Sequence, residues 1–448
     1  MQTKKTRQQI QSDALIALKQ NGYNGTIVLS TGSGKSKIAI DAIKNGKFKN
    51  ILITSPRTNL KENWRKELYK WGFKDYGDYW NFDAYGNCKY NITIENIQTC
   101  YKWSLEQIQQ FDYIIQDEIH TMVTPEYGRL INLAKAVNIS VTGLTATPDA
   151  HKEEKRLFYE TYCPIIYEYL DSAKDGIVNK RKYIIYEYEL TNDYQITAGT
   201  KAKPFKKGEK SQYEYLTNQL KRGQIQMSRT GSQDWFRDAA NWGWKNQGTP
   251  AQKIAAIQYL NAIKYRKEFL WNLDSSADIA VKIKELILET EKLNIAQLKA
   301  RSSSDRANVL FQSIKWNKVL LFSELTAQAE KLSKYTIHSN NSEEHNKQTL
   351  FAFDSGTIRE LASCNSLTLG LNIKGANYAI MESYSGSTTG FAQKAGRTDR
   401  LAVDDIATVI FIVPKGTQSE QWFNNATKQL DLSEAVYVNS LSQIKKLI

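Results

Sequence analysis

The chain has 448 residues, of which 41% are hydrophobic and 24% charged, and this composition indicates a soluble globular protein of two or three domains. No window approaches the roughly 20 apolar residues that span a bilayer, and the N-terminus lacks an apolar signal core, so the sequence predicts no membrane partner and a cytoplasmic location. The net charge of +13 favours a polyanionic partner such as nucleic acid, although lysines that only keep the surface soluble would give the same total.

The first predicted helix covers residues 7–18, where apolar residues recur at helical spacing. Gln11 lies in this helix, shortly before a glycine-rich turn. A glutamine amide in that place can bind the Watson–Crick edge of adenine. The alternative is a glutamine on the solvent face of an amphipathic helix.

The glycine-rich turn is the segment STGSGKS at residues 30–36. An apolar run precedes it and a helical run follows, which is the context of a phosphate-binding loop. The glycines let backbone N–H groups turn toward phosphate oxygens, and the helix directs its positive end at the same anion. The strict pattern starts with glycine where this chain has Leu29, and the alternative is a glycine turn with a chance lysine. The residues predicted to contact ATP are Thr31, Gly32, Ser33, Gly34, Lys35 and Ser36.

Two of these side chains have specific predicted roles. Lys35 would reach the β- and γ-phosphates, and the Ser36 hydroxyl would bind Mg²⁺. The four cysteines and four histidines are too scattered for a metal site built from protein ligands alone. The predicted cofactors are therefore ATP and Mg²⁺.

A buried strand is predicted at residues 51–54, followed by SPRT and a helix at 60–71. Small polar groups and an arginine at a strand end suit a phosphodiester contact, which makes Pro56 and Arg57 candidates. Residues 72–91 are rich in glycine, asparagine and aromatic residues and are predicted to form an irregular loop.

Another hydrophobic strand, at residues 113–117, ends in two adjacent carboxylates. Asp117 is predicted to hold Mg²⁺, directly or through water, and Glu118 to position and polarise the attacking water. The alternative is an acidic turn, which an upstream phosphate loop disfavours. We assign His120 a coupling role.

A further strand within residues 139–148 stops in small hydroxylated residues. Thr145 and Thr147 are predicted to hydrogen-bond both toward the Mg²⁺-bound phosphates and toward a neighbouring domain. This is also a coupling role.

In this order the motifs resemble those of a superfamily 2 helicase, and the Asp-Glu-Ile-His box at residues 117–120 resembles the DEAH variant. The family has an aromatic residue before the adenine-binding glutamine and an arginine three residues before it. This chain has Ile10 and, four residues before the glutamine, Arg7. The resemblance implies a second RecA-like domain that supplies the other wall of the ATP site.

The second half of the chain alternates strands and helices, which predicts a parallel, doubly wound sheet. Strands are predicted at residues 182–190, 318–323 and 335–339, and helices at 326–334 and 343–353.

Two later segments resemble helicase motifs V and VI, namely LTLGLNI at residues 367–373 and QKAGRTDR at 393–400. The resemblance implies that Arg400 is an arginine finger and that Arg397 makes a phosphate or relay contact. An arginine from the facing domain would stabilise the charge of the phosphoryl-transfer transition state, and the alternative is two surface arginines on a helix. The resemblance adds Gln393 to the catalytic set and Asn372 to the nucleotide site. The DNA-backbone contacts that it implies are Pro56, Arg57, Thr99, Ser323 and Thr368.

A long insertion separates strands 182–190 and 318–323. Its first part interleaves cations with aromatic residues, which suits stacking on single-stranded DNA, and the candidate residues are Trp235, Trp242 and Trp244. A strand-separating wedge is a second interpretation, and aromatic residues that pack a core are the alternative. Residues 251–271 and 276–299 are predicted to form two helices packed on the second RecA-like domain, and we assign no fold to residues 192–250.

The predicted fold class is α/β, with two RecA-like doubly wound parallel-sheet domains in tandem and a mainly helical insertion in the second half. The predicted domains are an ATP-binding domain at residues 1–170, a linker and first strand at 171–191, the insertion at 192–304 and a helicase C-terminal domain at 305–448.

The predicted function is an ATP-dependent DNA helicase or translocase that unwinds or remodels branched DNA. The chain looks most like phage branch-migration helicases of the UvsW kind. That similarity implies single-stranded, forked or four-way DNA as partner, and the cytoplasm of a bacterial host as location. Two alternatives stay open: the motor subunit of a restriction or nuclease complex, and a nucleic-acid-stimulated ATPase switch, on DNA or RNA, that does not unwind.

Overall fold

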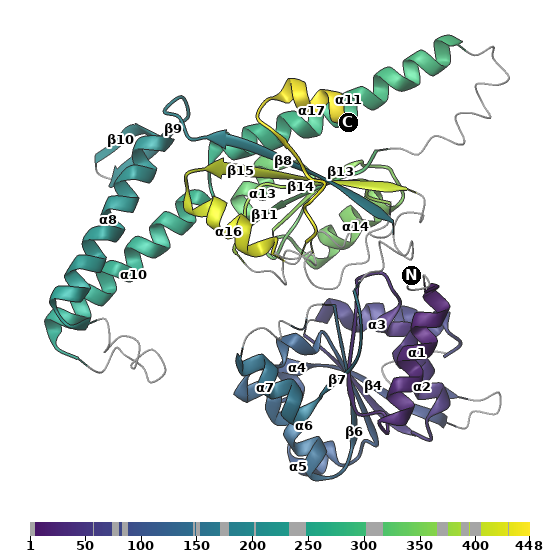
Figure 1. The fold of residues 1–448 in the computed structure, drawn as a ribbon. Helices are drawn as coiled ribbons and strands as arrows, with labels where there is room; N and C mark the ends of the chain where they lie inside the picture. The colour runs from purple at the N-terminus through teal and green to yellow at the C-terminus, as the bar shows by residue number, and fades with distance from the viewer. Residues whose placement is uncertain are drawn as a thin grey trace. The chain divides into compact units, whose positions relative to one another are not determined.

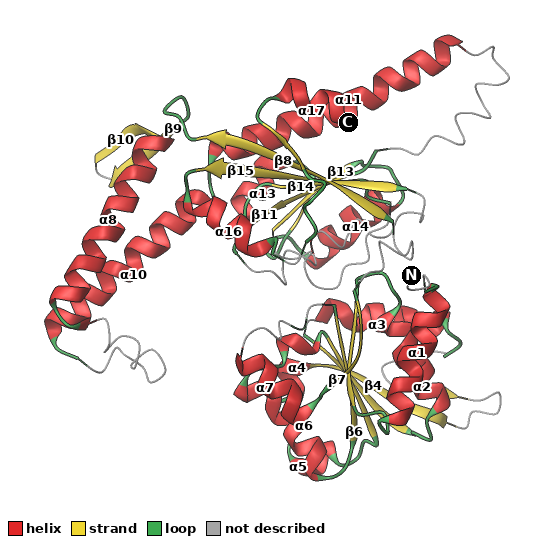
Figure 2. Ribbon diagram, in the orientation of Figure 1, coloured by secondary structure: helices red, strands yellow, loops and turns green. Residues whose placement is uncertain are grey.

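The computed structural model describes residues 5–56, 58–73, 80–82, 88–146, 148, 153–170, 179–200, 203–232, 248–301, 317–364, 375–386, 394, 405–428 and 430–448. The chain divides into two compact units, each of which contains a seven-stranded sheet, and a separate pair of strands lies in the second half (Figures 1 and 2).

The sheet of the first unit has the strand order β3-β4-β2-β5-β6-β1-β7. Its strands are β1 (Gly25–Leu29), β2 (Asn50–Ser55), β3 (Trp80–Phe82), β4 (Cys88–Asn96), β5 (Tyr113–Asp117), β6 (Ser140–Thr145) and β7 (Ile165–Tyr169). Its helices are α1 (Arg7–Gln20), α2 (Lys35–Asn45), α3 (Thr58–Lys70), α4 (Ile97–Cys100), α5 (Leu105–Ile108), α6 (Pro125–Ala136) and α7 (Glu153–Tyr162). All neighbouring strands pair in parallel except β3 and β4, which are antiparallel.

Both faces of this sheet are covered, because side chains alternate along each strand and both alternating sets are apolar. Ile51 and Ile53 of β2 belong to the core that α1, α2 and α3 cover. Leu52, between them, belongs to the opposite core, which also holds Leu130 of α6 and Phe158 of α7. The doubly wound architecture predicted for the first half is therefore confirmed.

The sheet of the second unit has the strand order β12-β13-β11-β14-β15-β8-β16. Its strands are β8 (Lys180–Glu189), β11 (Val319–Ser323), β12 (Thr336–Ile337), β13 (Glu360–Cys364), β14 (Tyr378–Met381), β15 (Ile406–Lys415) and β16 (Val436–Val438). Its helices are α11 (Asp274–Arg301), α13 (Thr326–Leu332), α14 (Glu343–Asp354), α16 (Gln418–Ala426) and α17 (Leu441–Leu447). The pairs β11–β13, β12–β13 and β8–β16 are parallel.

The insertion begins with an antiparallel hairpin, β9 (Gln195–Thr200) and β10 (Lys203–Gly208), and continues into α8 (Glu209–Arg229) and α10 (Pro250–Leu270). Helices α8 and α10 form a two-helix arm that extends from the second sheet (Figure 1). Gly223 lets the two helices approach closely, because a Cβ there would lie 3.2 Å from the Tyr259 Cα. The insertion is mainly helical, as predicted, and the hairpin is an addition that the sequence did not predict.

The structure corrects two boundaries expected from the sequence. Residues 72–91, predicted to be irregular, include β3 and the start of β4, so a strand pair occupies part of that loop. The strand predicted at residues 335–339 is only Thr336–Ile337. Two of the three strands concerned, β3 and β12, are edge strands with a single neighbour. None of the helices that the structure describes is both long and apolar enough to cross a membrane.

A buried glutamate joins the arm to the rest of the second unit. The Glu209 side chain, at the start of α8, is fully buried, and its Oε1 accepts hydrogen bonds from the backbone N–H groups of Asp274 at 2.7 Å and Ser275 at 3.2 Å. These N–H groups belong to the first turn of α11, where helix donors have no intrahelical partner. Burial raises the pKa of Glu209.

We expect the substitution Glu209→Ala to lower the free energy of unfolding by roughly 1–3 kcal/mol, because it leaves buried donors without an acceptor. Urea denaturation followed by tryptophan fluorescence would measure the change. Glu214→Ala is the matched control, since Glu214 lies exposed on the same helix and its loss should change stability by less than about 0.5 kcal/mol. Equal effects of the two substitutions would contradict the capping role.

Candidate nucleotide-binding site

The candidate site lies where three neighbouring strands of the first sheet end. The order β5-β6-β1 places these strands side by side and parallel, so their carboxyl ends meet at one edge. Asp117 pairs with Leu144 across β5 and β6, and Val28 pairs with Thr145 across β1 and β6. In open parallel sheets this edge is where ligands bind.

The loop after β1 has the backbone geometry that its glycines permit. Gly32 has φ +83° and Gly34 has φ +97°, both in the left-handed region that residues with a Cβ rarely adopt. Gly34 is the N-cap of α2, so the first N–H groups of that helix face the loop. This arrangement of helix N-terminus and glycine turn favours an anion.

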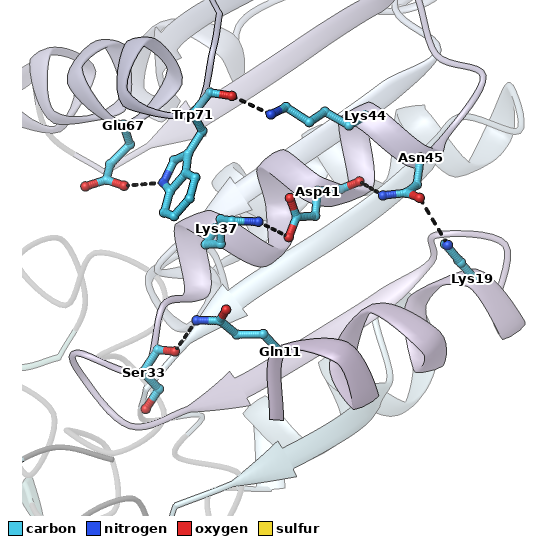
Figure 3. A network of polar contacts seen from close by, with 9 residues as sticks. All are labelled: Gln11, Lys19, Ser33, Lys37, Asp41, Lys44, Asn45, Glu67 and Trp71. Carbon is cyan, nitrogen blue, oxygen red and sulfur yellow. Dashed lines mark hydrogen bonds and ion pairs between the residues drawn. The ribbon is translucent and has the colours of Figure 1, made fainter. Parts of the chain in front are cut away.

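The Gln11 side chain contacts this loop rather than solvent. Its Nε2 donates a hydrogen bond to the Ser33 backbone oxygen at 3.0 Å (Figure 3). A Cβ on Gly34 would lie 2.2 Å from the same nitrogen, so a side chain at that position would displace the Gln11 amide. The structure thus disfavours the alternative of a solvent-facing glutamine, while adenine binding by Gln11 stays a prediction.

Helix α2 is held between α1 and α3 by polar contacts (Figure 3). Lys19 of α1 donates to Asn45 Oδ1 at 3.2 Å, and Asn45 in turn donates to the Asp41 backbone oxygen at 2.7 Å. On the other side, the Lys44 ammonium donates to the Trp71 backbone oxygen, just after α3. These contacts fix the helix that begins at Lys35, so they also fix the end of the loop.

Lys35 and Leu29 explain the departure from the strict loop pattern. Leu29 is the last residue of β1, and its side chain is fully buried in the core under α1 and α2. Its backbone oxygen accepts a hydrogen bond from Lys35 Nζ at 3.1 Å. The lysine is therefore directed back across the mouth of the loop toward a backbone oxygen that any residue would supply, and it is the buried Leu29 side chain that distinguishes this position from the glycine of the strict pattern.

Asp117 is held in place by a residue that sequence analysis missed. Trp64 of α3 donates from its indole Nε1 to Asp117 Oδ2 at 3.0 Å, and Trp64 is almost completely buried. Burial, then the charge of Glu118, raises the pKa of Asp117 well above its ordinary value, against the opposing effects of the Trp64 bond and the Lys35 charge. A cation near Asp117 would relieve the cost of its charge. In the sequence, the only signal at Trp64 is the apolar spacing of α3, which predicts a buried side chain but not a contact with Asp117.

Glu118 has a backbone conformation that is uncommon for a residue with a side chain. Its φ of +51° and ψ of +49° lie in the left-handed region and end the strand before a short 3₁₀ turn at Ile119–Thr121. Such a conformation costs of order 1–3 kcal/mol and is concentrated at functional sites. It turns the two adjacent carboxylates onto the edge of the sheet.

His120 connects the acidic box with the end of β6. Its Nδ1 lies 2.8 Å from Thr145 Oγ1 and 3.4 Å from Glu118 Oε2, and the imidazole is only 5% exposed. His120 therefore joins Glu118 of its own motif to Thr145 of the next motif. The sequence predicted coupling roles for two of them but not this chain of contacts.

The predicted nucleic-acid contacts that the structure describes differ in their exposure to solvent. Gln98 donates to the Pro56 backbone oxygen at 3.0 Å, which joins the segment after β2 to α4, and Thr99 beside it is exposed. Ser323 at the end of β11 is fully buried, and its hydroxyl donates to the Leu325 oxygen at 2.8 Å. Ten predicted site residues lie outside the described residues: Arg57, Thr147, Trp235, Trp242, Trp244, Thr368, Asn372, Gln393, Arg397 and Arg400.

Two family models match this chain. Residues 1–150 match the model described as type III restriction enzyme, res subunit, and residues 279–402 match the helicase conserved C-terminal domain. A curated relative, DNA 3'-5' translocase XPB2 of Sulfurisphaera tokodaii, is 23% identical over 403 residues, which cover 88% of this chain and 78% of the relative. Together these matches indicate an ATP-hydrolysing helicase of superfamily 2, which confirms the motif resemblance at the level of the superfamily, while the DEAH variant stays a prediction.

Comparison with solved structures identifies the fold of the two units. Dbp5 of S. cerevisiae, bound to RNA and ADP BeF3, has a TM-score of 0.56 and 12% identity, over 98% of this chain and 92% of that one. The Hef helicase domain of Pyrococcus furiosus has a TM-score of 0.50 and 16% identity, over 94% of this chain and 98% of that one. Both α/β units therefore have the RecA-like helicase fold, in tandem.

Proposed function

We propose that this helicase is a DNA-stimulated ATPase that translocates on DNA and remodels branched substrates such as forks and four-way junctions. The observation that carries the proposal is the group of polar side chains at the carboxyl ends of β1, β5 and β6, within a chain that matches helicase models in both halves. The net charge of +13 supports a nucleic-acid partner.

Within the first unit, each group has a proposed task in ATP hydrolysis. Lys35 would move from the Leu29 oxygen to the β- and γ-phosphates, and the N–H groups around Gly34 would hold the same phosphates. Glu118 would orient and deprotonate the attacking water. Oxygen ligands from Asp117 and Ser36 suit Mg²⁺, which would neutralise phosphate charge when bound.

The second unit would complete the transition state. In the proposed mechanism Arg400 acts as the arginine finger, Arg397 as a phosphate or relay contact, and Gln393 and Asn372 contact the nucleotide, as the resemblance to the family implies. An arginine of this kind contributes about 10³–10⁵-fold to the rate of turnover.

Three further parts of the proposal follow from the sequence. They are the domain boundaries at residues 170, 191 and 304, the assignment of the acidic box to the DEAH type, and branch migration of the UvsW kind.

Coupling between DNA binding and hydrolysis is assigned to the contacts of His120. The substitution Thr145→Val should keep the shape of the buried side chain and remove the hydroxyl that contacts His120 Nδ1. We expect DNA stimulation of the ATPase to fall roughly tenfold, which is about the effect of losing one buried hydrogen bond, while the KM for ATP without DNA changes little. Steady-state kinetics with and without DNA measure both; loss of basal activity alone would contradict a coupling role.

The experiment that tests the function compares ATPase activity and strand displacement on single-stranded, forked, four-way and blunt duplex DNA. We expect stimulation by branched DNA that falls steeply with salt, with a logarithmic slope of about 0.7–0.9 for each neutralised phosphate. Tails of either polarity would show the direction of movement, for which we propose 3'-5', as in the name of the Sulfurisphaera tokodaii relative. An ATPase that ignores both DNA and salt would contradict the proposal.

A second candidate function is the motor subunit of a restriction complex, because residues 1–150 match the model of a restriction-enzyme subunit. This candidate predicts DNA-stimulated hydrolysis by the isolated chain without strand displacement on any substrate. An ATPase switch would give the same result on RNA, so RNA substrates belong in the same comparison.

A further inference from the structure

The positive charge of this chain is concentrated in one segment. Residues 195–270 contain 14 lysines and arginines and five aspartates and glutamates, a net +9 out of the chain's +13. This segment holds the β9–β10 hairpin and the α8–α10 arm. Charge that is spread only for solubility would not collect in about a sixth of the sequence, so the segment is suited to a polyanion.

The hairpin presents an aromatic side chain without a covering layer. Phe205 of β10 is 54% exposed, and the residue opposite it on β9 is Ala198, which is too small to cover the ring. Lys203, two residues away on the same face of the strand, is also exposed, whereas Lys206 projects from the opposite face, where its ammonium donates to Thr197 Oγ1 at 3.1 Å. An isolated two-stranded hairpin has no second sheet to bury its aromatic face, and here nothing in the described residues replaces that layer.

The hairpin is nevertheless fixed at its base. The Lys207 ammonium lies 4.3 Å from the centre of the Tyr215 ring of α8, a cation–π contact. At the junction of β10 and α8, Gly208 fits against Asn192, whose Oδ1 would lie 2.2 Å from any Cβ at that position. The same Oδ1 accepts a hydrogen bond from the Ser211 backbone N–H at 3.0 Å. These contacts fix the base of the hairpin against α8, so the exposed position of Phe205 is also fixed.

We propose that the β9–β10 hairpin and the first turns of α8 form a binding surface for single-stranded nucleic acid, with Phe205 stacking on a base and Lys203 and Lys210 contacting phosphates. The inference rests on the proposed function and assigns it a particular surface. A single strand is favoured over a duplex because only unpaired bases offer a free face to an exposed ring. A protein partner would not need the excess of positive charge.

The test measures binding of a labelled oligo(dT) by fluorescence anisotropy over a series of salt concentrations, with oligo(rU) and a blunt duplex in parallel. The variant Phe205→Ala should weaken binding of the single strand by about 5- to 100-fold, and Phe205→Trp should restore it. The double variant Lys203→Ala and Lys210→Ala should lower the logarithmic salt slope by about 1.4, which is two lost phosphate contacts. Comparison of dT with rU shows which sugar is preferred.

Phe351→Ala is the matched control, because Phe351 of α14 is 75% exposed in the same unit and lies outside the basic segment. It should bind as the wild type does. Wild-type affinity of Phe205→Ala for single strands would overturn the inference, and so would an equal loss of single-strand and duplex binding. Neither result touches the proposed function, which fails instead if the wild-type ATPase does not respond to DNA.

Discussion

The variant Lys35→Ala is expected to lose ATP turnover by at least about 10²–10³-fold, because it removes the charge proposed to contact the β- and γ-phosphates in the transition state. Lys35 begins α2 and donates to the Leu29 oxygen, so removing its side chain breaks that hydrogen bond and leaves the side chains of the buried strand in place. DNA binding should be largely retained, since the basic segment at residues 195–270 is unchanged. ATPase assays and DNA anisotropy on the same preparation measure the two effects.

The matched control is Lys37→Ala. Lys37 lies on the same helix, two residues farther on, and its ammonium pairs with Asp41 and lies 4.6 Å from the Trp71 ring (Figure 3). Its loss removes a similar charge that faces the α3 side of the helix, so turnover should stay near the wild-type value. If both variants lost activity equally, the helix as a whole rather than the Lys35 charge would be responsible.

The second large effect is expected for Glu118→Gln, which should lower turnover by about 10²–10⁴-fold while ATP binding persists. The amide keeps the size of the side chain and a hydrogen-bonding atom toward His120, but it cannot accept a proton from water. Unlike Lys35→Ala, this variant should still bind ATP normally, because its phosphate loop is intact. Fluorescent nucleotide binding and single-turnover hydrolysis separate the two steps.

Glu126→Gln is a suitable control for this variant, since Glu126 lies exposed in the first turn of α6 and contacts no predicted site residue in the described part of the chain. A Glu118→Gln enzyme that hydrolyses ATP at the wild-type rate would remove Glu118 from its proposed role. A variant that also fails to bind nucleotide would show that the left-handed turn, rather than the carboxylate chemistry, has been disturbed.

The parts of the site that sequence analysis predicted are those encoded by adjacent residues. A strand followed by STGSGKS, and another followed by two carboxylates, are local patterns, and parallel strands bring their ends together without further information. The fold class follows from the same alternation of strands and helices. Contacts between distant residues were not predictable in this way, as Trp64 and Asp117 show, because a tryptophan at apolar spacing predicts only burial.

The hairpin in the insertion illustrates a second reason for failure. Strand β10 consists of Lys203–Gly208 with the sequence KPFKKG, which lacks the β-branched and alternating apolar residues of a typical strand. It forms because it pairs with β9 and is anchored to α8, so tertiary contacts override its propensity. The Trp residues chosen from composition alone lie outside the described residues, while Phe205, which the sequence analysis did not select, is exposed on this strand.

The buried Leu29 has a consequence for protein engineering. A consensus-guided redesign would restore glycine at the first position of the phosphate loop, where this chain departs from the strict pattern. That replacement would empty a fully buried side-chain volume between α1 and α2, and deletions of this size cost about 2–5 kcal/mol even when alanine remains. Family averages are therefore a poor guide at this position, because the local core, and not the nucleotide, determines which residue is tolerated there.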